Sequence, residues 1–333
     1  MGFKLKAGEF NETLNKLKKD YIIYAPKLLK GMGCFSDTDL VGYREISKVE
    51  EIEFNVKSEF SFKEVLLPIS QTLFYFTENK TTEPEMRSKG AIIFLRSCDL
   101  HSVKRLDEIY LNNGPEDFYY SKLRENVKFV IMDCNESFEN CFCVDMGTNI
   151  SEDYDFSLTL RHDNIFINSK WCVLTDLLKN YEEFTVSPKF VSENKINVNL
   201  PEEVDLSLFE SEIWDEYNSR CISCGRCNFV CPTCTCYTMQ DIFYEDNGKV
   251  GERRRVWSSC HVDGYTCMAG GHSFRDKKSQ RMRFKVLHKV YDYKKRFGYH
   301  MCTGCGRCDD VCPEYISFSN SVNKLTKATK EVK

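Results

Sequence analysis

Hydrophobic positions follow two different patterns along the chain, and the change comes near residue 200. Before it, short runs of β-branched and aromatic residues are separated by segments in which apolar residues recur at helical spacing. The predicted strands cover residues 21–24, 65–67, 91–95, 129–132 and 165–167, and the predicted helices cover 3–19 and 99–111. The order strand, helix, strand across 91–132 predicts a βαβ unit with a parallel pair of strands.

A polar segment over residues 185–208, interrupted by Pro188 and Pro201, marks the expected domain boundary. After it, β-branched runs are few and helical patterns prevail, with helical pieces expected at 240–244 and 281–293. We therefore predict an α+β protein. An α/β domain with a partly parallel sheet covers residues 1–205, and a mainly helical domain covers residues 206–333.

Charge and hydropathy exclude several classes of protein. The formal net charge is −4 over 333 residues, which is not typical of a polybasic nucleic-acid-binding chain. No apolar run is long enough to span a bilayer, and residues 1–10 contain no signal-peptide core. We expect a cytoplasmic protein with neither nucleic acid nor membrane as a partner.

Cysteine content changes this picture. The chain has 18 cysteines, and twelve of them lie between Cys221 and Cys312. Disulfides are the alternative explanation, but they need an oxidising compartment, and nothing in the sequence directs the chain to one. At this density in a cytosolic protein, cysteines are expected to bind metal.

Two of the cysteine-rich segments form an internal repeat. The segment Cys221-Ile-Ser-Cys224-Gly-Arg-Cys227-Asn-Phe-Val-Cys231-Pro232 matches Cys302-Thr-Gly-Cys305-Gly-Arg-Cys308-Asp-Asp-Val-Cys312-Pro313, 81 residues later. Both copies have the C-x2-C-x2-C-x3-C-P spacing of bacterial ferredoxins that bind [4Fe–4S] clusters. Two zinc sites are the alternative, but zinc ribbons separate their C-x2-C pairs instead of placing four cysteines within eleven residues. The sequence therefore predicts a two-cluster ferredoxin domain in the C-terminal part.

Each cluster is expected to take three cysteines from one copy of the motif and its fourth from the other copy. In two-cluster ferredoxins the last cysteine of each run binds the other cluster. The prediction for the first cluster is thus Cys221, Cys224, Cys227 and Cys312. For the second cluster it is Cys302, Cys305, Cys308 and Cys231.

Four further cysteines are candidates for a third [4Fe–4S] cluster. Cys98 and Cys134 each follow a predicted strand, and Cys141 and Cys143 come in the next loop. If the two strands are parallel neighbours, the thiols emerge at the sheet edge where α/β proteins bind ligands. The alternative is that they are small buried core residues. A separate group, Cys234, Cys236 and Cys260, is left open between a fourth-ligand role and the lining of a cluster site, and Cys34, Cys172 and Cys267 are interpreted as structural.

A basic segment lies between the two ferredoxin motifs. Residues 251–300 contain 13 Lys and Arg but four Asp and Glu, with Arg253, Arg254, Arg255, Arg275, Arg281 and Arg283 prominent. One interpretation is a solvated helix face. The other is a docking surface, or a positive environment that raises the cluster potential.

Signals of catalysis are missing from the sequence. No G-x-G-x-x-G follows a predicted strand, and no nucleophile–base constellation stands out. We therefore expect an electron carrier with no catalytic residues of its own. An iron–sulfur sensor or scaffold is the alternative, but no helix-turn-helix pattern accompanies the cysteines.

Several longer stretches resemble the ferredoxin-type electron-transfer subunit of anaerobic, NADH-dependent sulfite reductases, over nearly the whole chain. These stretches are Phe35-Ser-Asp-Thr-Asp39, Glu136-Ser-Phe-Glu-Asn-Cys141-Phe-Cys143, Met146-Gly-Thr-Asn149, Ser219-Arg-Cys-Ile-Ser-Cys224, Cys231-Pro-Thr-Cys-Thr-Cys-Tyr237, Gly251-Glu-Arg-Arg-Arg255, Met268-Ala-Gly-Gly-His272 and Leu287-His-Lys-Val290. The resemblance implies an iron–sulfur subunit that relays electrons from a flavin subunit, which oxidises NADH, to a sirohaem subunit, which reduces sulfite to sulfide. The same domain plan is similar to the beta subunit of sulfhydrogenase-type nickel–iron hydrogenases, which is the alternative.

Overall fold

The structure is a computed structural model that describes residues 1–34 and 37–332. Phe35 and Ser36, which begin one of the stretches quoted above, lie outside the described residues. The chain forms two compact units: unit 1 comprises residues 1–66, 86–138 and 147–193, and unit 2 comprises residues 67–85, 139–146 and 194–333. This division differs from a single boundary at 205/206, because residues 67–85 supply two strands to a sheet of unit 2.

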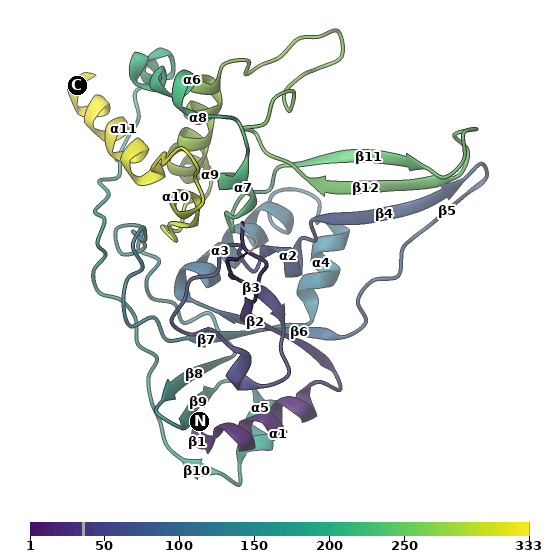
Figure 1. The fold of residues 1–333 in the computed structure, drawn as a ribbon, viewed down its shortest axis with the longest axis vertical. Coiled ribbons are helices and arrows are strands. Elements are labelled where there is room, and N and C mark those ends of the chain that lie inside the picture. Colours follow the sequence, from purple (N-terminus) through teal and green to yellow (C-terminus); the bar gives the residue numbers. More distant parts are fainter. Residues whose placement is uncertain (35–36, 333) are drawn as a thin grey trace. The chain divides into compact units, whose positions relative to one another are not determined.

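Unit 1 is built on an eight-stranded sheet of order β10-β1-β9-β8-β7-β6-β2-β3 (Figure 1). Its strands are β1 (Gly2–Lys6), β2 (Tyr21–Leu29), β3 (Leu40–Glu45), β6 (Gly90–Leu95), β7 (Val127–Met132), β8 (Phe156–Arg161), β9 (Asn164–Ser169) and β10 (Glu182–Glu183). The pairs β2–β6, β6–β7 and β7–β8 are parallel, and the others are antiparallel. The predicted partly parallel sheet is therefore confirmed.

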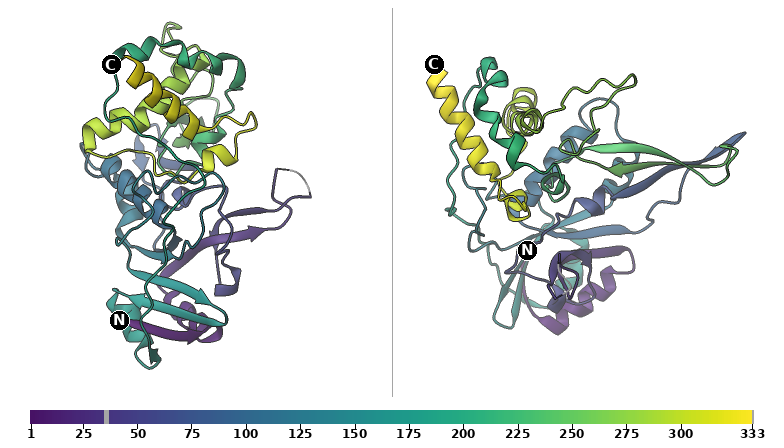
Figure 2. Two further views of the ribbon diagram at one scale, coloured as in Figure 1. Left: turned by 90° about the vertical axis from the view of Figure 1, so that its left-hand side faces the viewer. Right: turned by 45° about the horizontal axis from the view of Figure 1, so that its top comes forward.

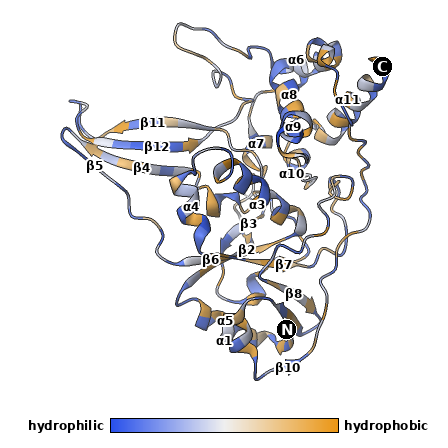
Figure 3. Cartoon of the chain, turned by 180° about the vertical axis from the view of Figure 1, so that it is seen from behind, coloured by the Kyte–Doolittle hydropathy of each residue, from blue (hydrophilic) through white to orange (hydrophobic). Residues whose placement is uncertain are grey.

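The central strands are apolar along their whole length because both faces of the sheet are covered. Every residue of β6 is buried, and Figure 3 colours the strand as hydrophobic almost throughout. The helices and helical turns of unit 1 are α1 (Ala7–Leu17), η1 (Val49–Glu51), α2 (Lys63–Leu66), α3 (Ser97–Tyr110), α4 (Phe118–Glu125) and α5 (Cys172–Leu178). One core cluster joins Leu14 of α1 and Leu174 of α5 to Phe94 and Phe156 of the sheet.

Two elements of unit 1 differ from the prediction. The helix expected over 3–19 begins only at Ala7, because Gly2–Lys6 forms a strand that pairs with β9, with Phe3 opposite Ile167. The strand expected over 65–67 lies mostly in the helical turn α2. A three-residue apolar run has no periodicity that distinguishes a strand from a buried helical turn.

Unit 2 is mainly helical and also contains a four-stranded sheet of order β11-β12-β4-β5 (Figure 1). Its helical elements are η2 (Leu206–Glu210), η3 (Glu212–Trp214), α6 (Glu216–Arg220), α7 (Arg226–Phe229), α8 (Lys278–Leu287), the π-helical turn η4 (His288–Asp292), α9 (Tyr293–Phe297), α10 (Arg307–Asp310) and α11 (Phe318–Val332). Its strands are β4 (Ser70–Thr77), β5 (Lys80–Thr82), β11 (Tyr237–Phe243) and β12 (Gly251–Trp257).

One of the two predicted helical pieces in unit 2 is confirmed and the other is wrong. Residues 281–293 lie within α8, η4 and the start of α9, as expected. Residues 240–244 instead belong mostly to β11, which pairs antiparallel with β12, so that Met239 lies opposite Arg255. Cross-strand pairing with a distant segment overrides a weak helical pattern here.

The core of unit 2 lies between α8, α11 and the turns that precede α6. Val286 of α8, Leu325 of α11 and Trp214 of η3 are buried in one cluster, and Figure 2 shows the C-terminal helix in yellow beside the green helices. The residues packed against this cluster include Cys221, Cys302, Cys308 and Cys312. Within the described residues, no helix has the length and apolar character needed to cross a membrane.

Candidate functional site

The two ferredoxin motifs fold into loops of the same design. In each, a glycine in the left-handed region precedes a one-turn helix: Gly225 (φ 75°) precedes α7, and Gly306 (φ 70°) precedes α10. The third residue of each motif, Ser223 or Gly304, is also in the left-handed region. Its backbone N–H donates to the sulfur of the motif's first cysteine at 3.4 Å. Such N–H groups directed at cysteine sulfur stabilise thiolates, as an iron–sulfur cluster requires.

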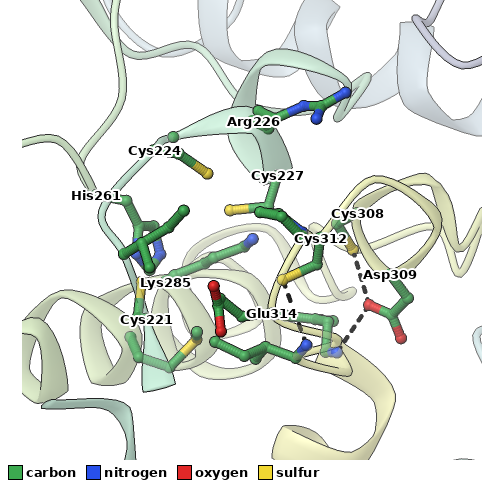
Figure 4. A pocket seen from close by; sticks show the side chains of 16 residues that line it. Cys221, Cys224, Arg226, Cys227, His261, Lys285, Cys308, Asp309, Cys312 and Glu314 are labelled. Carbon is green, nitrogen blue, oxygen red and sulfur yellow. Dashed lines mark hydrogen bonds between the residues drawn. The ribbon is translucent and has the colours of Figure 1, made fainter. Parts of the chain in front are cut away.

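The first predicted ligand set lines a single cavity of unit 2. Cys221, Cys224 and Cys227 lie on one side of this cavity, and Cys312 reaches it from the other motif (Figure 4). The backbone N–H of Ile316 donates to the Cys312 sulfur at 3.3 Å. The geometry thus brings together the four cysteines that the exchange of fourth members predicts for one cluster.

The second predicted set also gathers within unit 2. The thiols of Cys302 and Cys308 both lie close enough to Cys231 and Cys305 for the charges to interact. Cys231 therefore lies with the second motif although it belongs to the first. Cys308 also lines the cavity of the first set, so the two sets are neighbours.

The chemistry of both sets fits an iron–sulfur cluster. Burial raises the pKa of the Cys302 thiol to about 12 and also raises the pKa of Cys221 and Cys308, so these sulfurs become thiolates only with a cation to compensate them. Among residues 1–34 and 37–332, no three Cys, His, Asp or Glu side chains lie close enough to hold a single metal ion. A cubane binds each of its four thiolates to a different iron atom.

His261 gives an independent indication that the first cavity receives a polar group. Its side chain is 1% exposed and lines the cavity beside Cys224 and Cys221 (Figure 4). Neither of its ring nitrogens has a hydrogen-bond partner among the described residues. Buried polar atoms are seldom left without partners, and the sulfur atoms of a cluster would supply an acceptor.

The segment around Cys141 and Cys143 packs directly on the second motif. Phe142 donates its backbone N–H to the Gly304 carbonyl at 2.8 Å, and a Cβ on Gly304 would lie 2.6 Å from the Phe142 oxygen. Cys141 donates its thiol to the backbone of the second loop at 3.4 Å, and both cysteines are buried. The second loop is therefore covered by a short segment far from it in the sequence.

The other two candidates for a third cluster lie in unit 1. Cys98 is the second residue of α3, directly after β6, and Cys134 follows β7. Because β6 and β7 are parallel neighbours, both cysteines lie at the same edge of the sheet. Cys141 and Cys143 belong to unit 2, and the four-cysteine set stays a prediction.

The cysteines left open by the sequence form a compact thiol group beside the second set. Cys234 contacts Cys231, and Cys236 is hydrogen-bonded to Cys260, which also accepts a hydrogen bond from Asn228 at 3.0 Å. The hydrogen bond to Cys260 lowers the pKa of Cys236 to about 6. The three cysteines interpreted as structural are all exposed. They are Cys34, Cys172 and Cys267.

The basic segment is divided between surface and interior. Arg253 and Arg254 lie on β12 and form ion pairs with Asp241 and Glu252. Lys285 and Lys289, in contrast, are each 4% exposed and lie among the cysteines. Sequence reasoning counted these two lysines only within the charge total. The sequence pattern that indicates their burial is the spacing of four residues between them, next to the apolar positions of the same helix.

Comparisons with known proteins agree with this geometry. Residues 220–316 match the sequence profile of a family described as a 4Fe-4S dicluster domain. The chain is also 29% identical to sulfhydrogenase 2 subunit beta of Pyrococcus furiosus, across 97% of each chain. No solved structure matches the chain.

The dicluster match and the two cysteine sets lead to one functional statement. The chain carries [4Fe–4S] clusters and is an iron–sulfur electron-transfer protein.

A glycine substitution tests the packing on the second loop. At Gly306 an added Cβ would overlap the backbone carbonyl of Asn140, and the φ of 70° would be strained as well. Gly306→Ala should therefore lose about four iron atoms per chain, the content of one cluster. The control is Gly298→Ala, where φ is 83° but nothing lies within 4 Å of the added Cβ. It should cost about 1–2 kcal/mol of stability, because an L-residue is strained in this region, and it should keep its iron. Equal iron content in both variants would contradict the role of the packed segment.

Proposed function

We propose that each of the two clusters takes three cysteines from one motif and the fourth from the other. Cys221, Cys224, Cys227 and Cys312 hold the first cluster, and Cys302, Cys305, Cys308 and Cys231 hold the second. The cavity shared by the first set and the close approach of Cys231 to the second set support this assignment.

The proximity of the two sets is the observation that carries a relay function. Cys308 of the second set lines the cavity of the first, and the Lys285 ammonium interacts with both Cys227 and Cys308. Two clusters held by such neighbouring sets would exchange electrons directly. A chain with two such clusters and no recognisable catalytic constellation transfers electrons between partners.

We infer further that the chain is the electron-transfer subunit of a heteromeric, cytoplasmic oxidoreductase of the sulfhydrogenase type. The similarity to a sulfhydrogenase beta subunit over 97% of both chains supports this inference, because it includes unit 1 as well as the dicluster domain. In such a complex the nickel–iron catalytic site lies on another chain.

A second candidate is the ferredoxin-type electron-transfer subunit of an anaerobic sulfite reductase. The stretches Cys231-Pro-Thr-Cys-Thr-Cys-Tyr237 and Met268-Ala-Gly-Gly-His272 favour it, because they extend the resemblance beyond the cluster ligands. Here the partners would be a flavin subunit that oxidises NADH and a sirohaem subunit that reduces sulfite.

The identity of the complex is tested by isolating it through an affinity tag on this chain, under anaerobic conditions. The sulfhydrogenase assignment predicts stoichiometric nickel and hydrogen-dependent electron transfer. A sirohaem absorption spectrum with NADH-dependent formation of sulfide would instead select the second candidate. In either complex, Cys305→Ala should abolish electron flow between the partners. In the sulfite reductase complex it should leave the reduction of the flavin subunit by NADH intact. Substrate turnover by the isolated chain would contradict a pure relay role.

The iron content tests the proposed third cluster, held by Cys98, Cys134, Cys141 and Cys143. Two clusters give about eight iron atoms per chain, and three give about twelve. We expect about twelve, falling to about eight in the variant Cys98→Ala/Cys134→Ala. The exposed Cys172 provides the control, since Cys172→Ala should keep the full content. About eight iron atoms in the wild-type chain would contradict the third cluster and leave the other two unaffected.

The exchange of fourth ligands is tested by comparing single variants. Cys312→Ala and Cys224→Ala should leave the same remaining dicluster-domain signal in electron paramagnetic resonance spectra, because both remove the first cluster. Cys231→Ala and Cys305→Ala should leave the other signal. If Cys312→Ala matched Cys305→Ala instead, each motif would hold its own cluster.

A further inference from the structure

Three cations follow one another at intervals of four residues along α8 and η4, and all three are buried. Arg281, Lys285 and Lys289 are 6%, 4% and 4% exposed. One position after each of them, Met282, Val286 and Val290 are buried in the apolar core of unit 2. The helical segment therefore buries a row of positively charged side chains next to its row of apolar side chains. Burying an ammonium group is costly unless a negative partner compensates it.

The partners of Lys289 are sulfur and oxygen atoms at the second cysteine set. Its Nζ donates to the Cys231 sulfur at 3.3 Å and to the Thr233 hydroxyl at 2.8 Å. The charge of Cys302 acts on it as well. Lys289 thus faces the second set.

Lys285 lies one turn earlier and faces both sets. It lines the cavity of the first set, where Figure 4 shows its amine end directed toward Cys227. Its ammonium hydrogen-bonds to Cys227 and also interacts with Cys308 of the second set. It is therefore the cation shared by the two sets.

Each lysine has a cysteine sulfur as its compensating partner. The Lys289 Nζ donates to the Cys231 sulfur at 3.3 Å, and the Lys285 amine is directed toward Cys227 in the first cavity. A bound cluster strengthens this attraction, since its four thiolates outweigh the positive charge of the iron–sulfur core. Reduction of the cluster adds a further negative charge.

We propose that Lys285 and Lys289 set the reduction potentials of the two clusters, with Lys289 acting on the second cluster and Lys285 on both. A fixed positive charge beside a cluster stabilises its reduced form, and it does so strongly where water is excluded. The inference rests on the ligand sets proposed above. It also gives Lys285 a specific role, because a cation placed between the clusters allows both of them to hold an electron at the same time.

The test measures the midpoint potential of each cluster in the full chain by redox titration followed with electron paramagnetic resonance. The two midpoints are assigned with Cys224→Ala and Cys305→Ala, which each remove one dicluster-domain cluster. Lys289→Met should lower the midpoint of the second cluster and leave the first near its wild-type value. Lys285→Met should lower both midpoints. Lys289→Arg, which keeps the charge, should return the second midpoint toward the wild-type value.

The control is Lys295→Met, which removes an exposed lysine from α9 and should change neither midpoint. Unchanged midpoints in Lys285→Met and Lys289→Met, at full iron content, would overturn the proposal while leaving the ligand sets intact. Wrong ligand sets would appear separately, in the cysteine variants. If Lys289→Met and Lys289→Gln both lost the second cluster while Lys289→Arg kept it, the charge would serve cluster assembly, and the proposal would likewise be overturned.

Discussion

Negative charge buried at two neighbouring cysteine sets is the constraint on which unit 2 depends. Eight sulfurs gather within one compact region, and several of them lie where burial opposes ionisation. Backbone N–H groups directed at Cys221, Cys302 and Cys312 supply part of the compensation. The rest comes from whole charges, because Lys285 and Lys289 enter the same region from one helix. The cationic row is favourable in the interior because these sulfurs compensate its charge.

The long segment between the motifs is best understood through this constraint. Residues 232–301 separate two loops that a small ferredoxin holds close together in sequence. The segment supplies the helix with Lys285 and Lys289, and it also supplies His261 at the first cavity. It is therefore part of the cluster environment, and its length does not separate the two halves of the site.

The gathering of three thiols on each ligand loop was predictable from sequence, because covalent spacing alone determines which thiols meet on one loop. The parallel strands β6 and β7 were predictable for a similar reason, since continuous apolar runs such as 91–95 have few other uses. Elements whose secondary structure depends on pairing with distant segments were not predictable from sequence. Residues 2–6 pair with β9, and residues 240–243 pair with β12, and no local pattern shows either partner. The lysines were missed because a charged residue is expected at the surface, and only the presence of the thiolates makes their burial favourable.

The two motifs are nearly identical in sequence, but their surroundings make them unequal. Cys224 of the first motif is exposed, whereas its counterpart Cys305 is buried. The segment that carries Phe142 covers the second loop, and the matched arginines follow the same division, since Arg307 is 1% exposed and Arg226 is not buried. The ligand loop of the first motif is therefore more exposed than the loop of the second. Internal duplication supplies two ligand loops of the same spacing, and the segments packed around them make their exposure unequal.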